Sequence, residues 1–317
     1  MDRLKSREST ILAVHPGALG DVILFGRLLS MLKGPVRLVA GREKAELLVA
    51  LGVVRPALGF ESLPMEELFT DLPLAACRLP GLLGRCDRLV SCFPAGDRNA
   101  ELRLAAMCAA KDAAFLPTRP PEGFSGHLLE LWCDLLGVEF VPPASPWRLP
   151  DAAIKGANRE LKRIGVDAGS RCLVIHPGAG AKEKCWPLER FLELARNVAR
   201  AVVFILGPAE SDRWSAETIE SVRRVFPLLL QPSLTVLAGV LAGAGAYVGN
   251  DSGVSHLAGA VGTPTVAMFG PSRPENFAPV GPNVKVLAAR SVTGISTKQV
   301  LQALADLQGF SLRKRRR

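Results

Sequence analysis

The sequence predicts an α/β protein of two domains, each built on a doubly wound parallel sheet, and three observations predict it. The chain has 317 residues, more than the roughly 100–200 that one domain usually contains. One phrase, a short apolar strand followed by His-Pro-Gly-Ala, occurs at residues 10–18 and again at residues 172–179. After each copy, apolar runs alternate with helical stretches, which is the pattern of parallel strands joined by crossover helices.

The first half opens with a strand, a glycine-rich turn and a helix. Residues 10–15 are an apolar run, residues 16–20 contain the turn, and helical sequence follows from about Asp21. The same criteria predict strands at residues 36–40 and 88–93, and helices near residues 21–33, 42–51, 99–110 and 124–136.

Prolines mark the connector between the domains. Four of them lie between residues 141 and 150, where they exclude a helix interior or a central strand. We therefore expect domains at residues 1–150 and 151–317. The second domain is expected to contain strands at residues 172–176, 201–206, 246–249 and 265–269, and helices near 152–164 and 188–195. A last helix near residues 297–307 either caps this domain or crosses back to the first.

Composition places the chain among globular proteins. Hydrophobic residues make up 48%, charged residues 22% and aromatic residues 6%, as expected for buried parallel strands. No apolar run approaches the roughly 20 residues that span a bilayer, and residues 1–8 lack the apolar stretch of a signal peptide. We expect a cytoplasmic protein.

The seven cysteines do not suggest a disulfide framework or a zinc site. Their number is odd and none has Cys-x-x-Cys spacing. We interpret them as small buried hydrophobic residues. They are Cys77, Cys86, Cys92, Cys108, Cys133, Cys172 and Cys185.

The net charge of +9 suggests nucleic acid binding until its location is considered. Five of the charges belong to Arg313, Lys314, Arg315, Arg316 and Arg317, and the rest of the chain carries only about +4. We expect no nucleic acid partner. The tail is either a solvated end or a weak peripheral attachment to anionic membrane lipid, at about 1 kcal/mol per basic residue. In the second case, removing residues 313–317 will reduce binding to anionic vesicles at low salt.

Three loops of the second half follow predicted strands, where ligands bind in open parallel sheets. The first, residues 178–186, combines glycines with Lys182 and Lys184, which suits a phosphate but equally an ordinary turn. The second contains Glu210, either a first-turn helix acid or an acceptor for ribose hydroxyls.

The third loop, residues 249–258, is the most informative. Asp251 and Ser252 are good helix starters, and Gly253 permits close backbone approach, so free N–H groups would face a diphosphate. His256, about one turn further on, either donates to a phosphate oxygen or is an ordinary core histidine. The segment predicts a diphosphate site at a helix N-terminus.

Asp21 offers a different chemistry in the first half. A carboxylate at a helix start commonly serves only to stabilise the helix, by about 0.5–2 kcal/mol. Asp21 would also be ionised at neutral pH and able to accept a proton from a ligand that the second domain presents to it.

Four motifs follow one another along the chain, and they are Pro16-Gly17-Ala18-Leu19-Gly20-Asp21-Val22, Lys184-Cys185-Trp186-Pro187, Gly207-Pro208-Ala209-Glu210 and Asp251-Ser252-Gly253-Val254-Ser255-His256-Leu257-Ala258. Their sequences and their order resemble those of the heptosyltransferase family, glycosyltransferase family 9, whose members transfer heptose from ADP-heptose to the lipopolysaccharide core.

The resemblance implies a GT-B fold, with two Rossmann-like domains facing across a cleft, the acceptor on the first and the donor on the second. It implies an inverting transfer without metal or cofactor, from a nucleotide sugar such as ADP-heptose to lipopolysaccharide core or another glycolipid.

The family's roles carry over to matching positions. Asp21 would be the general base, Lys184 and the N–H groups near Ser252 would offset charge on the leaving diphosphate, and His256 would contact the phosphates. Glu210 and Asp251 would contact the nucleoside or the sugar. The implied donor-binding residues are Ala179, Gly180, Lys184, Glu210, Asp251, Ser252, Gly253, Val254 and His256.

The chain departs from the family in two places. Where some relatives have hydroxyl residues before the lysine, it has Ala179, Gly180 and Ala181, so the backbone must supply more of the donors. Residues 93–99, where acceptor contacts are expected, match only loosely.

Two alternatives stay open. A nucleotide-sugar epimerase of the same architecture would also need a diphosphate-binding helix N-terminus, although it would place more acidic and histidine residues around the sugar. A non-catalytic nucleotide-sugar or glycan-binding protein would need no general base. Asp21 discriminates between transfer and binding alone.

Overall fold

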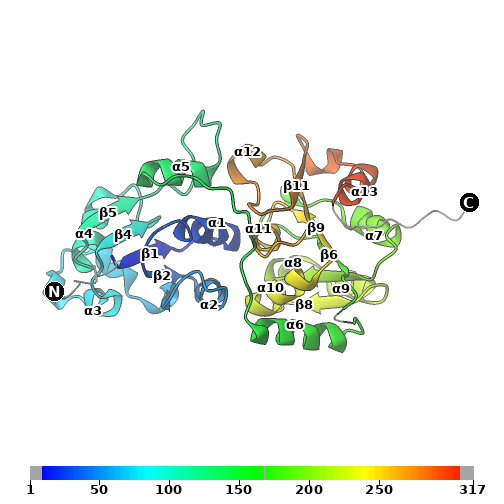
Figure 1. The fold of residues 1–317 in the computed structure, drawn as a ribbon, viewed down its shortest axis with the longest axis horizontal. Helices are drawn as coiled ribbons and strands as arrows, with labels where there is room; N and C mark the ends of the chain where they lie inside the picture. The colour runs from blue at the N-terminus through cyan, green and yellow to red at the C-terminus, as the bar shows by residue number, and fades with distance from the viewer. Residues whose placement is uncertain (1–8, 168, 308–317) are drawn as a thin grey trace, which may run out of the picture. The chain divides into compact units, whose positions relative to one another are not determined.

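The computed structural model describes residues 9–167 and 169–307, in two compact units that divide between Val141 and Pro142 (Figure 1). This division lies at the start of the proline-rich segment in which the sequence predicts a connector. The basic tail, Arg313 to Arg317, lies outside the described residues.

The first unit is built on a parallel sheet. Its strands are β1 (Ile11–His15), β2 (Val36–Ala40), β3 (Ala57–Gly59), β4 (Arg88–Ser91) and β5 (Asp112–Phe115). Their order is β3-β2-β1-β4-β5, and β1 pairs in parallel with both β2 and β4. From β1 the chain builds the sheet outward through β2 to β3, and it then returns to add β4 and β5 on the other side of β1. The direction in which strands are added therefore reverses between β1 and β4, and this is where a doubly wound sheet binds ligands.

Helices cover both faces of this sheet. They are α1 (Leu19–Leu29), α2 (Arg42–Ala50), α3 (Leu79–Leu83), α4 (Arg98–Met107) and α5 (Leu128–Leu136). Leu12 and Val14 of β1 pack in one apolar cluster with α3 and α4. On β1 the alternate residue His15 contacts Phe25 of α1 and Trp132 of α5, so these two helices cover the opposite face.

The second unit repeats the design with a larger parallel sheet. Its strands are β6 (Leu173–His176), β7 (Val202–Leu206), β8 (Leu228–Leu230), β9 (Ala246–Asn250), β10 (Thr265–Phe269) and β11 (Val284–Ala288). Their order is β11-β10-β9-β6-β7-β8, so the connections reverse between β6 and β9.

The helices of the second unit are α6 (Asp151–Arg163), α7 (Leu188–Arg196), α8 (Pro208–Arg213), α9 (Ala216–Arg223), α10 (Leu234–Gly243), α11 (Gly253–Ala260), α12 (Pro274–Phe277) and α13 (Thr297–Ala305). Residues of α7, α9 and α13 share one apolar cluster with the strands, whereas α10 packs against α6 and α11. The last helix, α13, contacts α7 and β10 and thus caps its own unit.

The predicted fold class, two α/β units with parallel sheets, is confirmed. The predicted strands are present with shifts of one or two residues at their ends. Four strands were missed, namely β3, β5, β8 and β11, and these are the edge strands of the two sheets. The helix predicted from residue 124 begins only at Leu128, because His127 caps it by accepting the Leu129 N–H.

Two further expectations concern membranes and thiols. Within the described part of the chain, no helix is both long and apolar enough to cross a membrane. Five of the seven cysteines are buried and none is in a disulfide, while Cys77 and Cys185 are half-buried.

Candidate functional site

The predicted donor loops converge at the carboxyl edge of the second sheet. β6 ends at His176 and its neighbour β9 ends at Asn250, and these strands flank the point where the connections reverse. Loops that leave two such strands diverge and open a crevice, which is the usual ligand site of doubly wound sheets.

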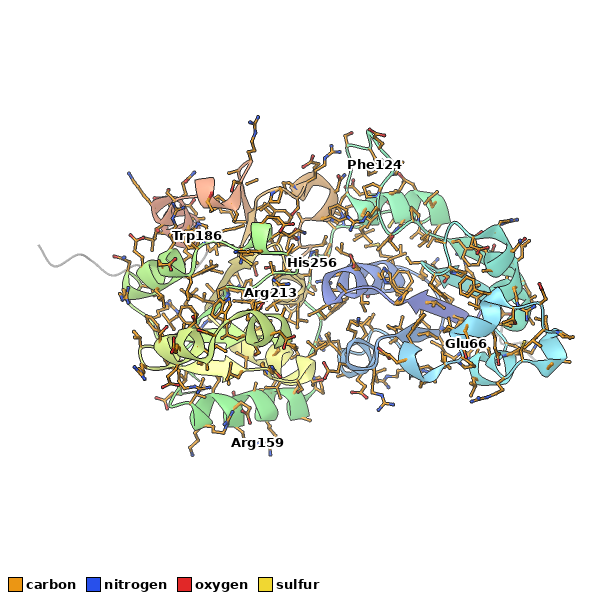
Figure 2. All side chains as sticks on the ribbon, turned by 180° about the vertical axis from the view of Figure 1, so that it is seen from behind. Glu66, Phe124, Arg159, Trp186, Arg213 and His256 are labelled. Carbon is orange, nitrogen blue, oxygen red and sulfur yellow. The ribbon has the colours of Figure 1, made fainter. Side chains whose placement is uncertain are left out.

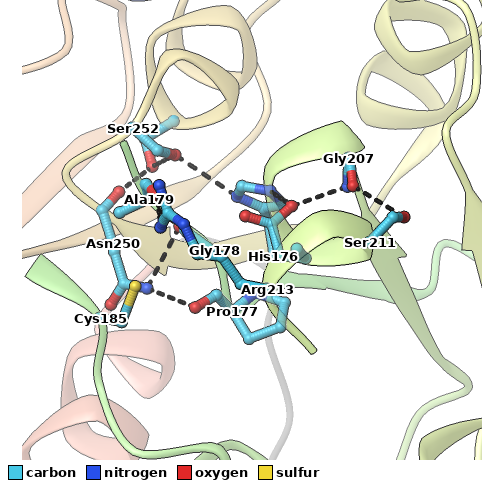
Figure 3. A network of polar contacts seen from close by, with 12 residues as sticks. His176, Pro177, Gly178, Ala179, Cys185, Gly207, Ser211, Arg213, Asn250 and Ser252 are labelled. Atoms are coloured by element: carbon cyan, nitrogen blue, oxygen red, sulfur yellow. Dashed lines mark hydrogen bonds and ion pairs between the residues drawn. The ribbon is translucent and has the colours of Figure 1, made fainter. Parts of the chain in front are cut away.

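Two side chains hold the loop that follows β6 by its carbonyl groups (Figure 3). Asn250, which is fully buried, donates through Nδ2 to the carbonyls of Pro177 at 2.8 Å and Gly178 at 3.3 Å. Arg213, the last residue of α8, donates to the carbonyls of Ala179 at 2.8 Å and Gly180 at 2.6 Å. The loop path is therefore determined by residues distant in sequence.

Glu210 and His176 form a buried pair beside this loop. Glu210 is 4% exposed, and its Oε2 accepts from the Gly207 N–H at 2.7 Å and pairs with His176 Nε2 at 3.3 Å. Burial opposes ionisation of Glu210, but these hydrogen bonds outweigh it and hold its pKa below the ordinary value. A Cβ at Gly178 would lie 1.7 Å from Glu210 Oε1, so the carboxylate packs directly against the loop backbone.

Lys184 is held by a carboxylate rather than projecting freely. Its Nζ donates to Asp251 Oδ2 at 2.6 Å, and the Ser272 hydroxyl donates to the same oxygen at 2.6 Å. The Lys184 side chain is 34% exposed and that of Asp251 is 10% exposed. An anion arriving here would compete with Asp251 for the ammonium group.

Trp186 anchors the segment that carries Lys184. The indole is 2% exposed, donates from Nε1 to the Ile295 carbonyl at 2.8 Å, and packs edge-on against Phe191 of α7. Its backbone N–H donates to Asn250 Oδ1 at 3.0 Å. Figure 2 labels Trp186, Arg213 and His256 among the side chains of the second unit.

The N-terminus of α11 lies where the sequence predicts a helix start, at Ser252 and Gly253. Ser252 stands at the N-cap position but makes no side-chain cap; its Oγ lies 3.4 Å from both His176 Nδ1 and Ser255 Oγ. Asp251 does not cap the helix either, because its carboxylate binds Lys184. The first-turn N–H groups of Gly253 and Val254 therefore lack a side-chain cap.

His256 lies in the next turn of α11, where it is 5% exposed. Its backbone N–H donates to the Ser252 carbonyl at 3.3 Å.

Asp21 lies in the first turn of α1, in the first unit. Its Oδ2 accepts the Ala18 N–H at 3.1 Å, as expected for a first-turn acid. Two further contacts hold the preceding turn: the Gly17 N–H donates to His15 Nδ1 at 3.0 Å, and Lys44 Nζ donates to the Gly17 carbonyl at 2.6 Å.

His15 is the counterpart of His176, because each ends the central strand of its sheet. Burial, reinforced by the charge of Lys44, lowers the pKa of His15 to about 4. The imidazole is therefore neutral at physiological pH, with Nδ1 as the acceptor for Gly17. It locks the turn that presents Asp21.

The structure thus joins four of the predicted donor residues through side-chain contacts, in two separate groups at this edge of the sheet. His176 links Glu210 to Ser252, and Asp251 binds Lys184. Four members of the site were given no individual role from the sequence: His176, Arg213, Asn250 and Ser272. His176 belongs to the repeated His-Pro-Gly-Ala phrase, Arg213 follows Glu210 by one helical turn, and Asn250 lies within the predicted loop of residues 249–258, whereas no pattern pointed to Ser272.

Metal ligands were not expected. In residues 9–167 and 169–307, no cluster of three or more His, Cys, Asp or Glu side chains is arranged to hold a metal ion.

The fold and the loops at its carboxyl edges define a two-unit, doubly wound α/β protein of the GT-B class. Residues 125–302, more than half of the chain, match the model of glycosyltransferase family 9 (heptosyltransferase). The chain belongs to this family.

Individual relatives agree with this placement. The chain is 29% identical over 155 residues to lipopolysaccharide heptosyltransferase 1 of Escherichia coli K12, a match that covers 48% of each protein. The chain thus spans about half the length of the curated relatives it matches. The family model covers residues 125–302 and the match to this relative covers 155 residues, so each spans only part of the chain.

Solved structures extend the likeness of the fold to nearly the whole chain. A family 9 glycosyl transferase from Veillonella parvula DSM 2008 superposes with a TM-score of 0.75 at 18% identity, covering 94% of this chain and 96% of that one. E. coli heptosyltransferase WaaC, solved with ADP, gives a TM-score of 0.68 at 19% identity, covering 94% of this chain and 99% of WaaC.

Proposed function

We propose that the protein transfers a sugar from a nucleotide-sugar donor, with ADP-heptose as the first candidate, to a hydroxyl of lipopolysaccharide core or a related glycan. The transfer is inverting and independent of metal. Family membership supports the reaction class, and the curated relatives named for lipopolysaccharide support the acceptor. The WaaC structure with ADP supports an adenine nucleotide.

One observation carries the donor half of the proposal: cationic and backbone donors meet at the carboxyl edge between β6 and β9. Lys184 and the uncapped first turn of α11 are suited to a diphosphate, and Glu210 is a buried, ionised acceptor beside them. Leaving-group charge can be stabilised by preorganised cations and helix N-termini alone. This chemistry replaces the divalent metal that other transferases use.

The acceptor half rests on Asp21. Its carboxylate accepts the Ala18 N–H, and the preceding turn is fixed at Gly17, whose N–H donates to His15 and whose carbonyl accepts from Lys44. A general base must be ionised and must keep its position while the proton transfers. We propose that Asp21 takes the proton of the acceptor hydroxyl as the sugar–oxygen bond forms.

The direct test is the Asp21→Asn variant. Asparagine has nearly the same shape, and its side-chain oxygen still accepts the Ala18 N–H, but it cannot act as a base. We expect transfer to fall by about 10²–10⁴-fold, with nucleotide binding unchanged by calorimetry. Wild-type turnover in this variant would remove Asp21 from the mechanism.

The donor is identified by a thermal-shift screen of ADP-, UDP- and GDP-sugars. A ligand present at 100 times its Kd stabilises the native state by about 2.7 kcal/mol, which is a readily measured shift. Stabilisation by ADP-sugars above the others supports the proposal. A protein that none of these nucleotide sugars stabilises does not have the proposed donor site.

A further inference from the structure

We infer that Arg213 is a positioning residue for the donor diphosphate: it turns two backbone amides, those of Gly180 and Ala181, outward as an anion cradle. The inference rests on the proposed function and assigns a role to a residue that does not itself touch the donor. It concerns how the loop after β6 binds anions without side-chain hydroxyls.

The first step is the geometry of the two hydrogen bonds. Arg213 Nη1 donates to the Ala179 carbonyl at 2.8 Å and Nη2 donates to the Gly180 carbonyl at 2.6 Å (Figure 3). Both peptide bonds are trans, since the cis bonds of the described residues are elsewhere, at Pro56 and Pro94. In a trans peptide the carbonyl and the following N–H point in opposite directions.

The consequence is a pair of outward-facing donors. The Gly180 N–H shares its peptide plane with the Ala179 carbonyl, and the Ala181 N–H shares its plane with the Gly180 carbonyl. Because Arg213 binds both carbonyls, both N–H groups point away from the guanidinium. Within the described residues neither N–H has a hydrogen-bond partner, and Gly180 is exposed while Ala181 is half-buried.

Successive free N–H groups form a concave anion site, which is the arrangement that many phosphate-binding loops use. Residues 179–181 offer no hydroxyl group, so these amides are the donors that this part of the loop has available. Three residues later the chain carries Lys184, whose ammonium group lies at the same edge of the sheet.

An arginine is suited to holding the carbonyls of Ala179 and Gly180 together, for two reasons. Its planar fork presents two N–H groups in a fixed geometry and can bind two carbonyls at once, which a lysine ammonium does less well. Arg213 also makes no ion pair in the described part of the chain, so its positive charge is not neutralised and adds to the attraction for a diphosphate.

Arg213 is itself well placed to act as a clamp. It ends α8, whose first turn is fixed by the hydrogen bonds of Glu210 to the Gly207 N–H and to His176. Asn250 restrains the preceding carbonyls, those of Pro177 and Gly178. Removing the Arg213 guanidinium therefore releases only the carbonyls of Ala179 and Gly180, while Asn250 still holds the start of the loop.

The test compares two arginine variants by calorimetry with ADP. Arg213→Met keeps the apolar stem and removes the fork. Arg37→Met is the matched control, because Arg37 also donates to two carbonyls, those of Leu83 and Arg85, at 2.6 and 2.8 Å, in the first unit. Hydrogen bonds to charged groups contribute about 1.5–3 kcal/mol each, so losing the effect of one predicts about 10- to 100-fold weaker ADP binding.

Of these two variants, only Arg213→Met should weaken the binding of ADP, while both should lower the midpoint of thermal unfolding. AMP, which lacks the second phosphate, should lose less affinity than ADP. Arg213→Lys keeps the charge without the fork and should fall between Arg213→Met and wild type. Equal ADP affinity in wild type and in folded Arg213→Met overturns the inference.

A measurement on the wild type covers the case in which Arg213→Met does not fold. In protein labelled with ¹⁵N-glycine, the Gly180 amide signal, assigned through Gly180→Ala, should shift when ADP is added. An unmoved Gly180 signal in a protein that binds ADP overturns the inference and leaves the proposed function intact. A wild-type protein that binds no nucleotide diphosphate contradicts the proposed function instead.

Discussion

Gly178 permits a sharp test of the buried Glu210 carboxylate, because the two groups are in direct contact. A Cβ on Gly178 would lie 1.7 Å from Glu210 Oε1 and 2.0 Å from its Cδ, distances that no real structure tolerates. Gly178→Ala must therefore displace the Glu210 side chain from a site in which it is 4% exposed.

The expected cost follows from what Glu210 would lose. Its Oε2 accepts from Gly207 N at 2.7 Å and pairs with His176 Nε2 at 3.3 Å. Two hydrogen bonds to a charged group contribute about 1.5–3 kcal/mol each, so Gly178→Ala should lower the free energy of unfolding by about 3–6 kcal/mol. Urea denaturation measures the change.

A double-mutant cycle identifies the cause. Glu210→Ala removes the same two hydrogen bonds and also the obstacle to a Cβ, so adding Gly178→Ala to it should cost little more. Gly180→Ala is the control: a Cβ there meets nothing within 4 Å, and its stability should stay within about 1 kcal/mol of wild type. Additive effects of Gly178→Ala and Glu210→Ala would refute the reasoning.

Two further predictions concern charge. Because the folded pKa of His15 is about 4 and its ordinary value is 6.5, the unfolded chain binds the extra proton between these pH values. The stabilisation that neutral His15 gives the folded protein is therefore fully present above pH 6.5 and is lost as the pH falls towards 4. The free energy of unfolding should fall by up to about 3 kcal/mol over this range. The difference in free energy of unfolding between wild type and His15→Phe should shrink over that range, and a constant difference would show that His15 titrates normally. For the donor site, Lys184→Ala and His256→Ala should each weaken ADP binding in calorimetry, and Lys184→Ala should also reduce its dependence on salt, since a screened cation–phosphate attraction is removed. Wild-type affinity in both variants would contradict the site.

The sequence predicted the central strands well for a simple reason. β1, β6, β7, β9 and β10 are buried along their whole length and mostly apolar, because both of their faces are covered by helices. The missed strands lie at the sheet edges: β3 and β5 are at most half-buried, and β11 is exposed at its end. β8 is an apolar run of three leucines, but a run of three residues is too short to be assigned to a strand from periodicity.

The site residues divide in a similar way. Asp21, Lys184, Glu210 and the segment from Asp251 to His256 were singled out because each lies in a loop after a predicted strand or at a helix start, and the resemblance to glycosyltransferase family 9 supplied their expected roles. Arg213 and Ser272 were missed because their importance comes from partners far along the chain. Arg213 binds Ala179, 34 residues away, and Ser272 binds Asp251, 21 residues away.

By itself, the sequence determined the two-unit α/β class, the repeated strand–turn–helix opening and the carboxyl edge at which the loops gather. These properties depend on local periodicity and turn chemistry, which neighbouring residues encode. Only the tertiary structure decided that Asp251 holds Lys184 instead of starting α11, that Glu210 is buried against Gly178, and that Arg213 clamps the loop after β6. Such pairings form between elements that meet only when the sheet assembles, so no local pattern records them.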